Sequence, residues 1–366
     1  MAKMRRDRLT ELATSMPMHN RDALNGGPPC RPSAGVSMFS NRIKLATLFA
    51  AAALSLAAYN NARARKALAP RSRGRTLRID GVDLSIIEKG SGPPLLLLHG
   101  NGSVAEDFAV SGVLDLASAN HRVLAFDRPG FGGSSRPARK RWSACEQADL
   151  FHEAAAKIGI HKYLVLGHSW GAWIALEMAR RHAPSVAGLV LVSGYYYPSP
   201  RLDLALAALP AVPLMGSAFL HTLLPLAVRL GWPSAMRRIF RPGPISNVFS
   251  VSTKEVASRP SQLRSVCVET ALMLGAALFT KPSYRDIDVP TGIVAGAGDR
   301  LFDARREAER LHAEISGSLM EIIPNSGHMA HHSDPQAVLG MIDKVTCMPR
   351  PPKEGGSSDA LSPAAR

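Results

Sequence analysis

Cysteine is scarce in this sequence, which has four in 366 residues: Cys30, Cys145, Cys267 and Cys347. They lie far apart and show neither CxxC spacing nor the density of a disulfide scaffold. A zinc site would need clustered His and Cys ligands, and the pair His331 and His332 is too short a cluster to indicate one. We therefore expect free thiols in a reducing compartment and no metal site.

Acidic residues are few at the N-terminal end. Residues 1–75 contain fourteen Lys and Arg against three Asp and Glu, which accounts for +11 of the formal net charge of +15. Only +4 remains for residues 76–366, and no basic stripe follows residue 80. A nucleic-acid-binding protein would carry its basic residues on a folded face or recognition helix, so we do not expect nucleic acid as a partner.

The first 37 residues have no hydrophobic period and mix charge with Pro-Pro and Gly-Gly, which predicts a disordered basic leader. Residues 38–75 then hold a positive lead, an uncharged run over 45–59 and a basic linker. This layout is typical of a signal peptide, although 45–59 is short for a spanning helix unless its Asn and Ala neighbours extend it. No good cleavage site follows, so we expect an uncleaved membrane anchor. Export after signal cleavage is the alternative, and Met38 is an alternative start.

The charge bias around this run predicts an orientation. Within about 20 residues of it, the N-terminal side has three Lys and Arg and the C-terminal side has seven. Because positive flanks stay in the cytoplasm, we expect a membrane-anchored protein whose main body, C-terminal to the apolar run, faces the cytoplasm.

From residue 76 the chain alternates strands and helices. Alternating or wholly apolar runs predict strands at 76–80, 82–90, 93–100, 121–127, 162–169, 188–194, 291–296 and 318–323. Helical patterns lie at 144–158, 171–181, 304–314 and 336–344. This alternation predicts an α/β fold with a mostly parallel sheet that has helices on both faces.

The alternation is interrupted between about residues 195 and 288, where the sequence is rich in Leu, Ala, Met and Pro and predicts a mainly helical insertion. After residue 345, Pro, Gly, Ser and charged residues predict a disordered tail over 346–366. One folded domain that contains this insertion is therefore expected over 76–345.

A G-x-S-x-G motif at 167–171 places Ser169 between an apolar strand and a helix. That setting is typical of a nucleophile elbow, a strained turn that exposes the serine hydroxyl above the sheet. A serine hydroxyl is a weak nucleophile unless a base accepts its proton. We therefore look for a histidine and an acid on later loops.

His328 follows the last predicted strand, directly after Gly327, and is the expected base. An acid must then fix the tautomer of its imidazole. Asp299 ends the strand at 291–296 and is the expected acid, with Asp303 as its rival. The resulting chain order is Ser, Asp, His, the one expected where the nucleophile lies on a strand–turn–helix elbow.

Two backbone N–H groups are expected to stabilise the oxyanion, those of Trp170 and of Asn101 on the loop after the strand at 93–100. Phe108 and Tyr195 are tentative pocket residues. The insertion adds further aromatic and Met side chains, which favours an apolar acyl or aromatic substrate: Tyr196, Tyr197, Phe219, Trp232, Met236, Phe240, Met273 and Phe279.

The motifs together resemble the α/β-hydrolase superfamily, over about residues 77–345. They occur in family order, as HGNG at 99–102, DRPGFGGS at 127–134, GHSWG at 167–171, GAGD at 296–299 and SGH at 326–328. The resemblance implies that the insertion is a lid and that the turn at 127–134 helps shape the pocket. Epoxide hydrolases and haloalkane dehalogenases of this superfamily use Asp as nucleophile, which Ser169 argues against.

The resemblance leaves several reactions open. We expect a serine hydrolase that cleaves an ester-like or related acyl bond of a small, apolar molecule. The alternatives are a carbon–carbon bond hydrolase, an aminopeptidase, an acyltransferase and a non-catalytic ligand-binding module. No cofactor is implied, because a triad and an oxyanion hole are sufficient for acyl transfer.

Overall fold

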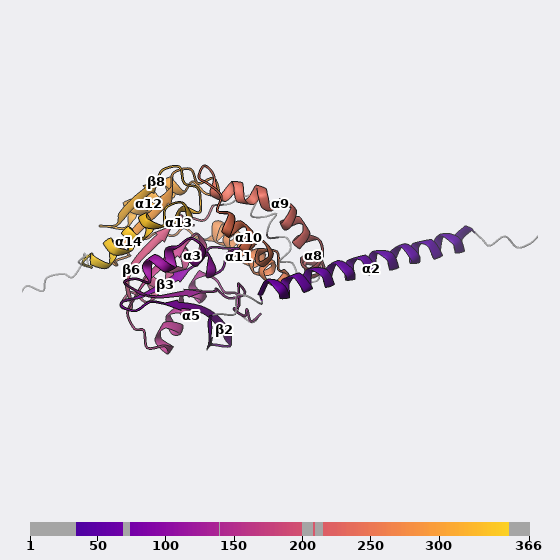
Figure 1. The fold of residues 1–366 in the computed structure, drawn as a ribbon, viewed down its shortest axis with the longest axis horizontal. Coiled ribbons are helices and arrows are strands. Elements are labelled where there is room, and N and C mark those ends of the chain that lie inside the picture. Colours follow the sequence, from indigo (N-terminus) through magenta and orange to yellow (C-terminus); the bar gives the residue numbers. More distant parts are fainter. Residues whose placement is uncertain (1–33, 69–73, 139, 200–207, 209–214, 351–366) are drawn as a thin grey trace, which may run out of the picture. The chain divides into compact units, whose positions relative to one another are not determined.

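The computed structural model describes residues 34–68, 74–138, 140–199, 208 and 215–350 (Figure 1). The chain forms two compact units, Met1–Ala53 and Leu54–Arg366. Outside the described residues lie 1–33 of the predicted leader, 69–73 of the predicted linker and 351–366 of the predicted tail.

Helix α2 runs from Ala34 to Leu68 and is longer than the apolar run that predicted it. The prediction of disorder was wrong for 34–37, and the helix continues into the predicted basic linker as far as Leu68. Alanine, arginine and lysine favour a helix, and Arg65 and Lys66 in the last turn complement its dipole. Large apolar side chains on α2 are exposed, among them Leu48 and Phe49.

Two helices in the described part of the chain are long and apolar enough to cross a membrane: Asn41–Ala67 within α2, and α11, Pro260–Phe279. The α2 window is 6% buried and the α11 window 39%. Core helices of soluble proteins and signal sequences satisfy the same criteria. Length and composition therefore allow α2 to associate with a membrane.

All eight predicted strands form one sheet of order β1-β2-β4-β3-β5-β6-β7-β8. The pairs β1·β2 and β2·β4 are antiparallel and every other pair is parallel. The strands are β1 (Arg75–Ile79), β2 (Val82–Lys89), β3 (Pro94–Leu98), β4 (Arg122–Phe126), β5 (Tyr163–His168), β6 (Val186–Val192), β7 (Thr291–Gly296) and β8 (Leu319–Ile323).

Helices cover both faces of the sheet. Successive strand residues point to opposite sides, so a wholly apolar strand presents apolar side chains to both faces. In β3, Leu96 and Leu98 join one core cluster while Leu95 and Leu97 join the other. The first face is covered by α5 (Ala144–Lys157), α6 (Trp170–Arg181) and α12 (Ala304–Glu314). The second is covered by α3 (Glu106–Val110), α4 (Val113–Ala117), α13 (Ala330–Ser333) and α14 (Pro335–Cys347).

Local sequence signals set several helix starts. Ser143 and Glu146 form a reciprocal capping box at the start of α5. Asp334 caps α14, and a proline follows at its first helical position. The prediction of a disordered tail was wrong for residues 346 and 347, which belong to α14.

The insertion is helical where it is described, as predicted, and its helices group together above the sheet (Figure 1). They are α8 (Met215–His221), α9 (Leu223–Phe240), α10 (Asn247–Ala257) and α11 (Pro260–Phe279). Residues 200–207 and 209–214 of the insertion lie outside the described part. We call these four helices the lid.

The described cysteines are free: Cys145, Cys267 and Cys347. This agrees with the expectation of unpaired thiols. Cys30 lies outside the described residues.

The turn between β5 and α6 has no room for side chains at its two glycines. A Cβ atom on Gly171 would lie 2.0 Å from the carbonyl oxygen of Leu98, and one on Gly167 would lie 2.3 Å from that of Gly171. Both obstacles are backbone atoms, which cannot move without shifting β3 or α6.

We predict that Gly171→Ala destabilises the protein by about 3 kcal/mol, because the new methyl group forces backbone apart in a packed core. Gly340→Ala is the matched control, since a Cβ there meets nothing within 4 Å inside α14. It should be neutral or stabilise by about 0.5–1 kcal/mol. Urea unfolding of both variants checks this, and equal stabilities would contradict it.

Candidate active site

Ser169 sits at the turn between β5 and α6 with φ 54° and ψ −117°. A non-glycine residue with positive φ in this region is strained, and such strain persists only where surrounding structure imposes it. Backbone contacts hold the turn: Ser169 N donates to Val192 O at 3.0 Å, and Tyr195 N donates to Ser169 O at 3.2 Å. Ser169 therefore has the backbone geometry expected of a nucleophile elbow.

His328 and Asp299 meet on the loops that follow β8 and β7. The distance from His328 Nδ1 to Asp299 Oδ2 is 2.7 Å, and both side chains are buried. The other carboxylate oxygen accepts from Leu301 N at 2.8 Å and Phe302 N at 3.3 Å. These bonds hold the carboxylate in an orientation that directs it at the imidazole.

The rival acid Asp303 lies elsewhere. Its carboxylate caps α12 by accepting from Arg306 N at 3.3 Å. Because an N-cap side chain points at its own helix, Asp303 is occupied in forming α12. Of the two acids that the sequence offers, Asp299 is the one bonded to His328.

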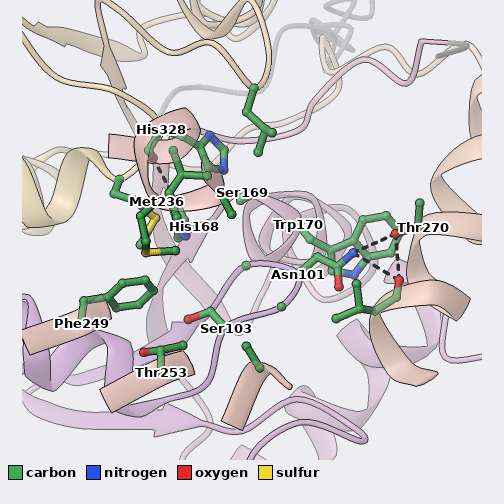
Figure 2. Close-up of a pocket in the computed structure, with 18 of the residues that line it drawn as sticks. Asn101, Ser103, His168, Ser169, Trp170, Met236, Phe249, Thr253, Thr270 and His328 are labelled. Atoms are coloured by element: carbon green, nitrogen blue, oxygen red, sulfur yellow. Dashed lines mark hydrogen bonds between the residues drawn. The ribbon is translucent and has the colours of Figure 1, made fainter. Parts of the chain in front are cut away.

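A cavity of about 330 Å³ lies between the sheet and the lid. Ser169, Trp170 and His328 line it, and so do Gly100 and Asn101 of the loop after β3 (Figure 2). The lid side is apolar and includes Val228, Trp232, Met236, Ile239, Phe249, Leu263 and Met273. Ser169 and His328 thus border a cavity whose lid side is mostly apolar.

Neither Phe108 nor Tyr195, the two tentative pocket residues, lines this cavity. Phe108 is fully buried against His331, in the core cluster on the α14 side of the sheet. Tyr195 is also fully buried and stacks beside Trp170 and Phe302. Their place in sequence next to the site was misleading, because their side chains point into the core.

The predicted insertion residues divide between lining and packing. Trp232, Met236 and Met273 line the cavity. Tyr196, Tyr197 and Phe240 are buried outside it, while Phe219 and Phe279 are exposed. Sequence alone could not separate these groups, since all lie on or beside similar apolar helices.

Arg128 holds the loop that carries the proposed oxyanion donor Asn101. Its side chain donates to His99 O at 2.8 Å and to Gly100 O at 3.1 Å. Its backbone N–H donates to His99 Nε2 at 3.0 Å. Burial and the nearby Arg128 charge hold the pKa of His99 well below its usual value, so this ring stays neutral and accepts the bond.

Glu269 of the lid helix α11 pairs with Arg128 through two bonds, of 2.6 and 2.9 Å. Both side chains are completely buried. Gln147 donates to the same carboxylate at 3.0 Å and accepts from Arg128 at 3.1 Å. A second link from α11 reaches Asn101 itself, whose amide donates to Thr270 Oγ1 at 3.3 Å (Figure 2).

The sequence analysis missed Arg128 and Glu269, although a signal was present. Glu269 is the only acidic residue in the apolar stretch 260–279. A lone acid in an apolar helix requires a partner wherever the helix buries it, because an unpaired buried charge is costly. The cation in the turn at 127–134 was the available candidate.

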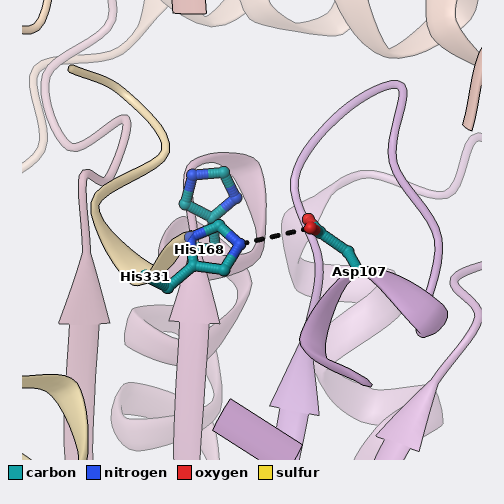
Figure 3. A group of neighbouring side chains, drawn as sticks. All are labelled: Asp107, His168 and His331. Carbon is teal, nitrogen blue, oxygen red and sulfur yellow. Dashed lines mark ion pairs between the residues drawn. The ribbon is translucent and has the colours of Figure 1, made fainter. Parts of the chain in front are cut away.

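A buried cluster of one acid and several histidines packs against the loop that carries His328. Asp107 accepts from His332 Nε2 at 2.6 Å and from Ser103 Oγ at 2.8 Å, and His331 Nε2 lies 3.4 Å from it (Figure 3). Burial alone raises the pKa of Asp107, but His331 and His332 outweigh it and hold that pKa well below its usual range.

Asp107, His168 and His331 could each offer one atom to a metal, and these atoms lie within 4.8 Å of one another. A tetrahedral zinc site needs ligand atoms about 3.4 Å apart, given Zn–N bonds of about 2.0–2.1 Å. Asp107 is already bonded to His332 and Ser103. We therefore interpret the cluster as structural support. His168 adds to it with Nε2 3.1 Å from the carbonyl of His328.

Residues 95–340 match the model of the alpha/beta hydrolase family. The chain belongs to this family. The match agrees with the sheet order, the helical lid and the turn that carries Ser169, so the family resemblance expected from the motifs is confirmed. The chain is accordingly a hydrolase of the α/β fold.

Similar proteins span several hydrolytic reactions. Haloalkane dehalogenase 2 of Mycobacterium tuberculosis (strain ATCC 25618 / H37Rv) is 26% identical over 281 residues, covering 74% of this chain and 91% of the relative. A membrane phospholipase A described as a bacterial virulence factor has a TM-score of 0.59 and 22% identity, covering 86% of this chain and 98% of that one. A thermophilic esterase from Thermogutta terrifontis has a TM-score of 0.59 and 19% identity, covering 75% and 98%. At these identities the two structures show the fold alone.

We predict that Glu269→Ala costs about 3–5 kcal/mol of stability, because it leaves Arg128 charged and buried without its partner. The double variant Arg128→Met/Glu269→Met should recover much of that loss by filling the space with apolar groups. Guanidinium unfolding of the three proteins checks this. A single variant as stable as the parent would contradict it.

The stability of the fold depends on pH through Glu307. Burial raises the pKa of Glu307 to about 7, while the N–H groups of Tyr196 and Tyr197 oppose the rise. A raised pKa stabilises the fold only while the acid is protonated, so this stability is present below the unfolded pKa and is lost as pH rises through about 7. Glu307→Gln should therefore reduce the loss of Tm between pH 5.5 and pH 8. The exposed Glu309→Gln should leave that loss unchanged.

Proposed function

We propose that the chain is a serine hydrolase in which Ser169 is the nucleophile, His328 the base and Asp299 the acid that orients it. The observation that carries the proposal is the 2.7 Å contact between His328 and Asp299 beside a cavity that Ser169 also lines. A base held by a carboxylate next to a strained serine is the arrangement that acyl transfer requires.

The proposed reaction begins when His328 accepts the Ser169 proton and the oxygen attacks the acyl carbon. The N–H groups of Asn101 and Trp170 stabilise the resulting oxyanion, and His328 then protonates the leaving group. Water repeats the sequence to release the acid. Ser169, His328, Asp299 and the two N–H groups are sufficient for each step.

The walls of the cavity support an apolar acyl substrate. No acidic side chain occurs among its described lining residues, so nothing there would pair with the free ammonium group that an aminopeptidase must bind. We therefore propose ester hydrolysis ahead of peptide hydrolysis. Adding an alcohol and analysing the products distinguishes hydrolysis from acyl transfer to another acceptor.

We further propose that α2 anchors the enzyme in a membrane. Its apolar side chains are exposed over residues 43–54, among them Ile43, Leu45 and Leu54. The excess of basic residues after this run favours a catalytic domain on the cytoplasmic side. Protease protection in sealed vesicles tests the orientation.

A fluorophosphonate probe should label the full-length protein at one residue, Ser169. Ser169→Ala should take no label and lose turnover of a short p-nitrophenyl ester. Adduct mapping by mass locates the label, and circular dichroism verifies that the variant is folded. Label on another serine, or full turnover by the variant, would overturn the assignment.

Asp299→Asn should lower kcat by up to about 10⁴-fold, because the imidazole adopts the wrong tautomer while the pocket stays intact. Asp303→Asn is the matched control, and it should keep near-parental kcat because asparagine also caps helices well. If Asp303→Asn proves the more damaging variant, Asp299 is not the acid.

A further inference from the structure

A groove of about 650 Å³ opens on the surface between α9 and α10 of the lid and the last turns of α2. Polar and charged side chains line it together with apolar ones. They are Arg63, Arg237, Lys254, Glu255, Asn247, Ser250, Trp232, Pro233, Met236, Ile245 and Val251. The established family and the proposed triad do not account for this groove.

The charge of the groove is positive. Three cations, Arg63, Arg237 and Lys254, face one acid, Glu255. That acid is already shared, since Arg63 binds it through bonds of 2.7 and 3.0 Å and Arg229 approaches it at 3.3 Å. Among the described residues, Arg237 and Lys254 have no acidic partner. The groove therefore attracts an anion.

Its α2 wall is held firmly on the lid. Asn60 is fully buried and donates to the carbonyls of His221 and Thr222, both at 2.9 Å. It also accepts from Arg229 at 2.7 Å. These bonds keep Arg63, one turn later on α2, at the edge of the groove.

The floor of the groove is also a wall of the cavity at Ser169. Trp232 and Met236 line both spaces. Trp232 is fixed, because its Nε1 donates to Ser250 O at 3.0 Å and Ser250 Oγ at 3.2 Å. Met236 is buried in the apolar cluster that also holds Trp232, Phe240 and Phe249, and its unbranched thioether can adopt other rotamers. Both side chains belong to the wall that the groove and the cavity share.

The geometry points to a substrate site that extends through this shared wall: the enzyme takes an amphiphile whose anionic group binds Arg237 and Lys254 in the groove. Its apolar chain passes Met236 and brings the ester to Ser169. This inference rests on the proposed serine mechanism and adds the substrate class. A carboxylate and a phosphate satisfy the same cations, so the shared chemistry is an anionic head on an apolar chain.

The test uses full-length enzyme in lipid nanodiscs and matched pairs of esters. One probe is the p-nitrophenyl monoester of suberic acid, which ends in a carboxylate, and its partner is the same ester capped by a methyl group. Adipic and sebacic analogues vary the chain length. We expect the anionic probe to have a kcat/KM about tenfold higher at its best length, equal to about 1.4 kcal/mol. Added salt should reduce this preference.

The double variant Arg237→Gln/Lys254→Gln should abolish the preference through a higher KM for the anionic probe, because the lost contact acts in ground and transition states alike. Arg238→Gln is the matched control, since it removes the same charge from the next residue of α9, which does not line the groove. It should keep the preference. An alkyl phosphate of similar length should compete with the anionic probe in the parent enzyme.

Turnover of both probes at equal efficiency for every chain length would overturn the inference and leave the serine mechanism standing. The same holds if the double variant keeps the full preference. If the folded parent enzyme turns over neither probe and fluorophosphonate does not label Ser169, the serine mechanism is overturned, and the inference with it.

Discussion

The buried ion pair between Arg128 and Glu269 is the interaction on which the site depends. It joins three parts of the chain: the turn after β4, the loop that carries Asn101, and the lid helix α11. Two charges removed from water are costly unless each finds full hydrogen bonding. Here Gln147 and two backbone carbonyls supply the remaining bonds. The ion pair therefore couples the core to the lid, and removing either side chain would leave the other charge buried without its partner.

That coupling has a chemical consequence. Oxyanion donors act only if they are held where charge develops, before the reaction begins. The loop at His99–Asn101 is neither helix nor strand. Arg128 holds it by donating to the carbonyls of His99 and Gly100, and Glu269 of the lid balances the charge of Arg128. Asp107 and its histidine neighbours support the loop of His328. Hydrogen-bonded groups thus hold the loops of the proposed reacting residues, while the lid side of the cavity is mostly apolar.

The lid separates two environments with different chemistry. Inside, the cavity beside Ser169 has a mostly apolar lining, and exclusion of water strengthens electrostatic interactions there. Outside, cations of α2, α9 and α10 form a groove of positive charge. An amphiphile matches both, since its head and tail have opposite preferences for water. The end of α2 places Arg63 at the edge of this groove, in addition to the anchoring role that we propose for the helix.

The sequence alone determined the eight strands, the lid insertion and the order of Ser169, Asp299 and His328, because these depend on short-range patterns of burial and turn residues. It also proposed Asp299 over Asp303 from position on a strand end. Only the tertiary structure decided that Phe108 and Tyr195 point into the core, that Arg128 meets Glu269, 141 residues away, and that Met236 faces two spaces at once. Such pairings depend on how distant segments pack, and periodicity reports which face of a helix is buried without naming what it is buried against.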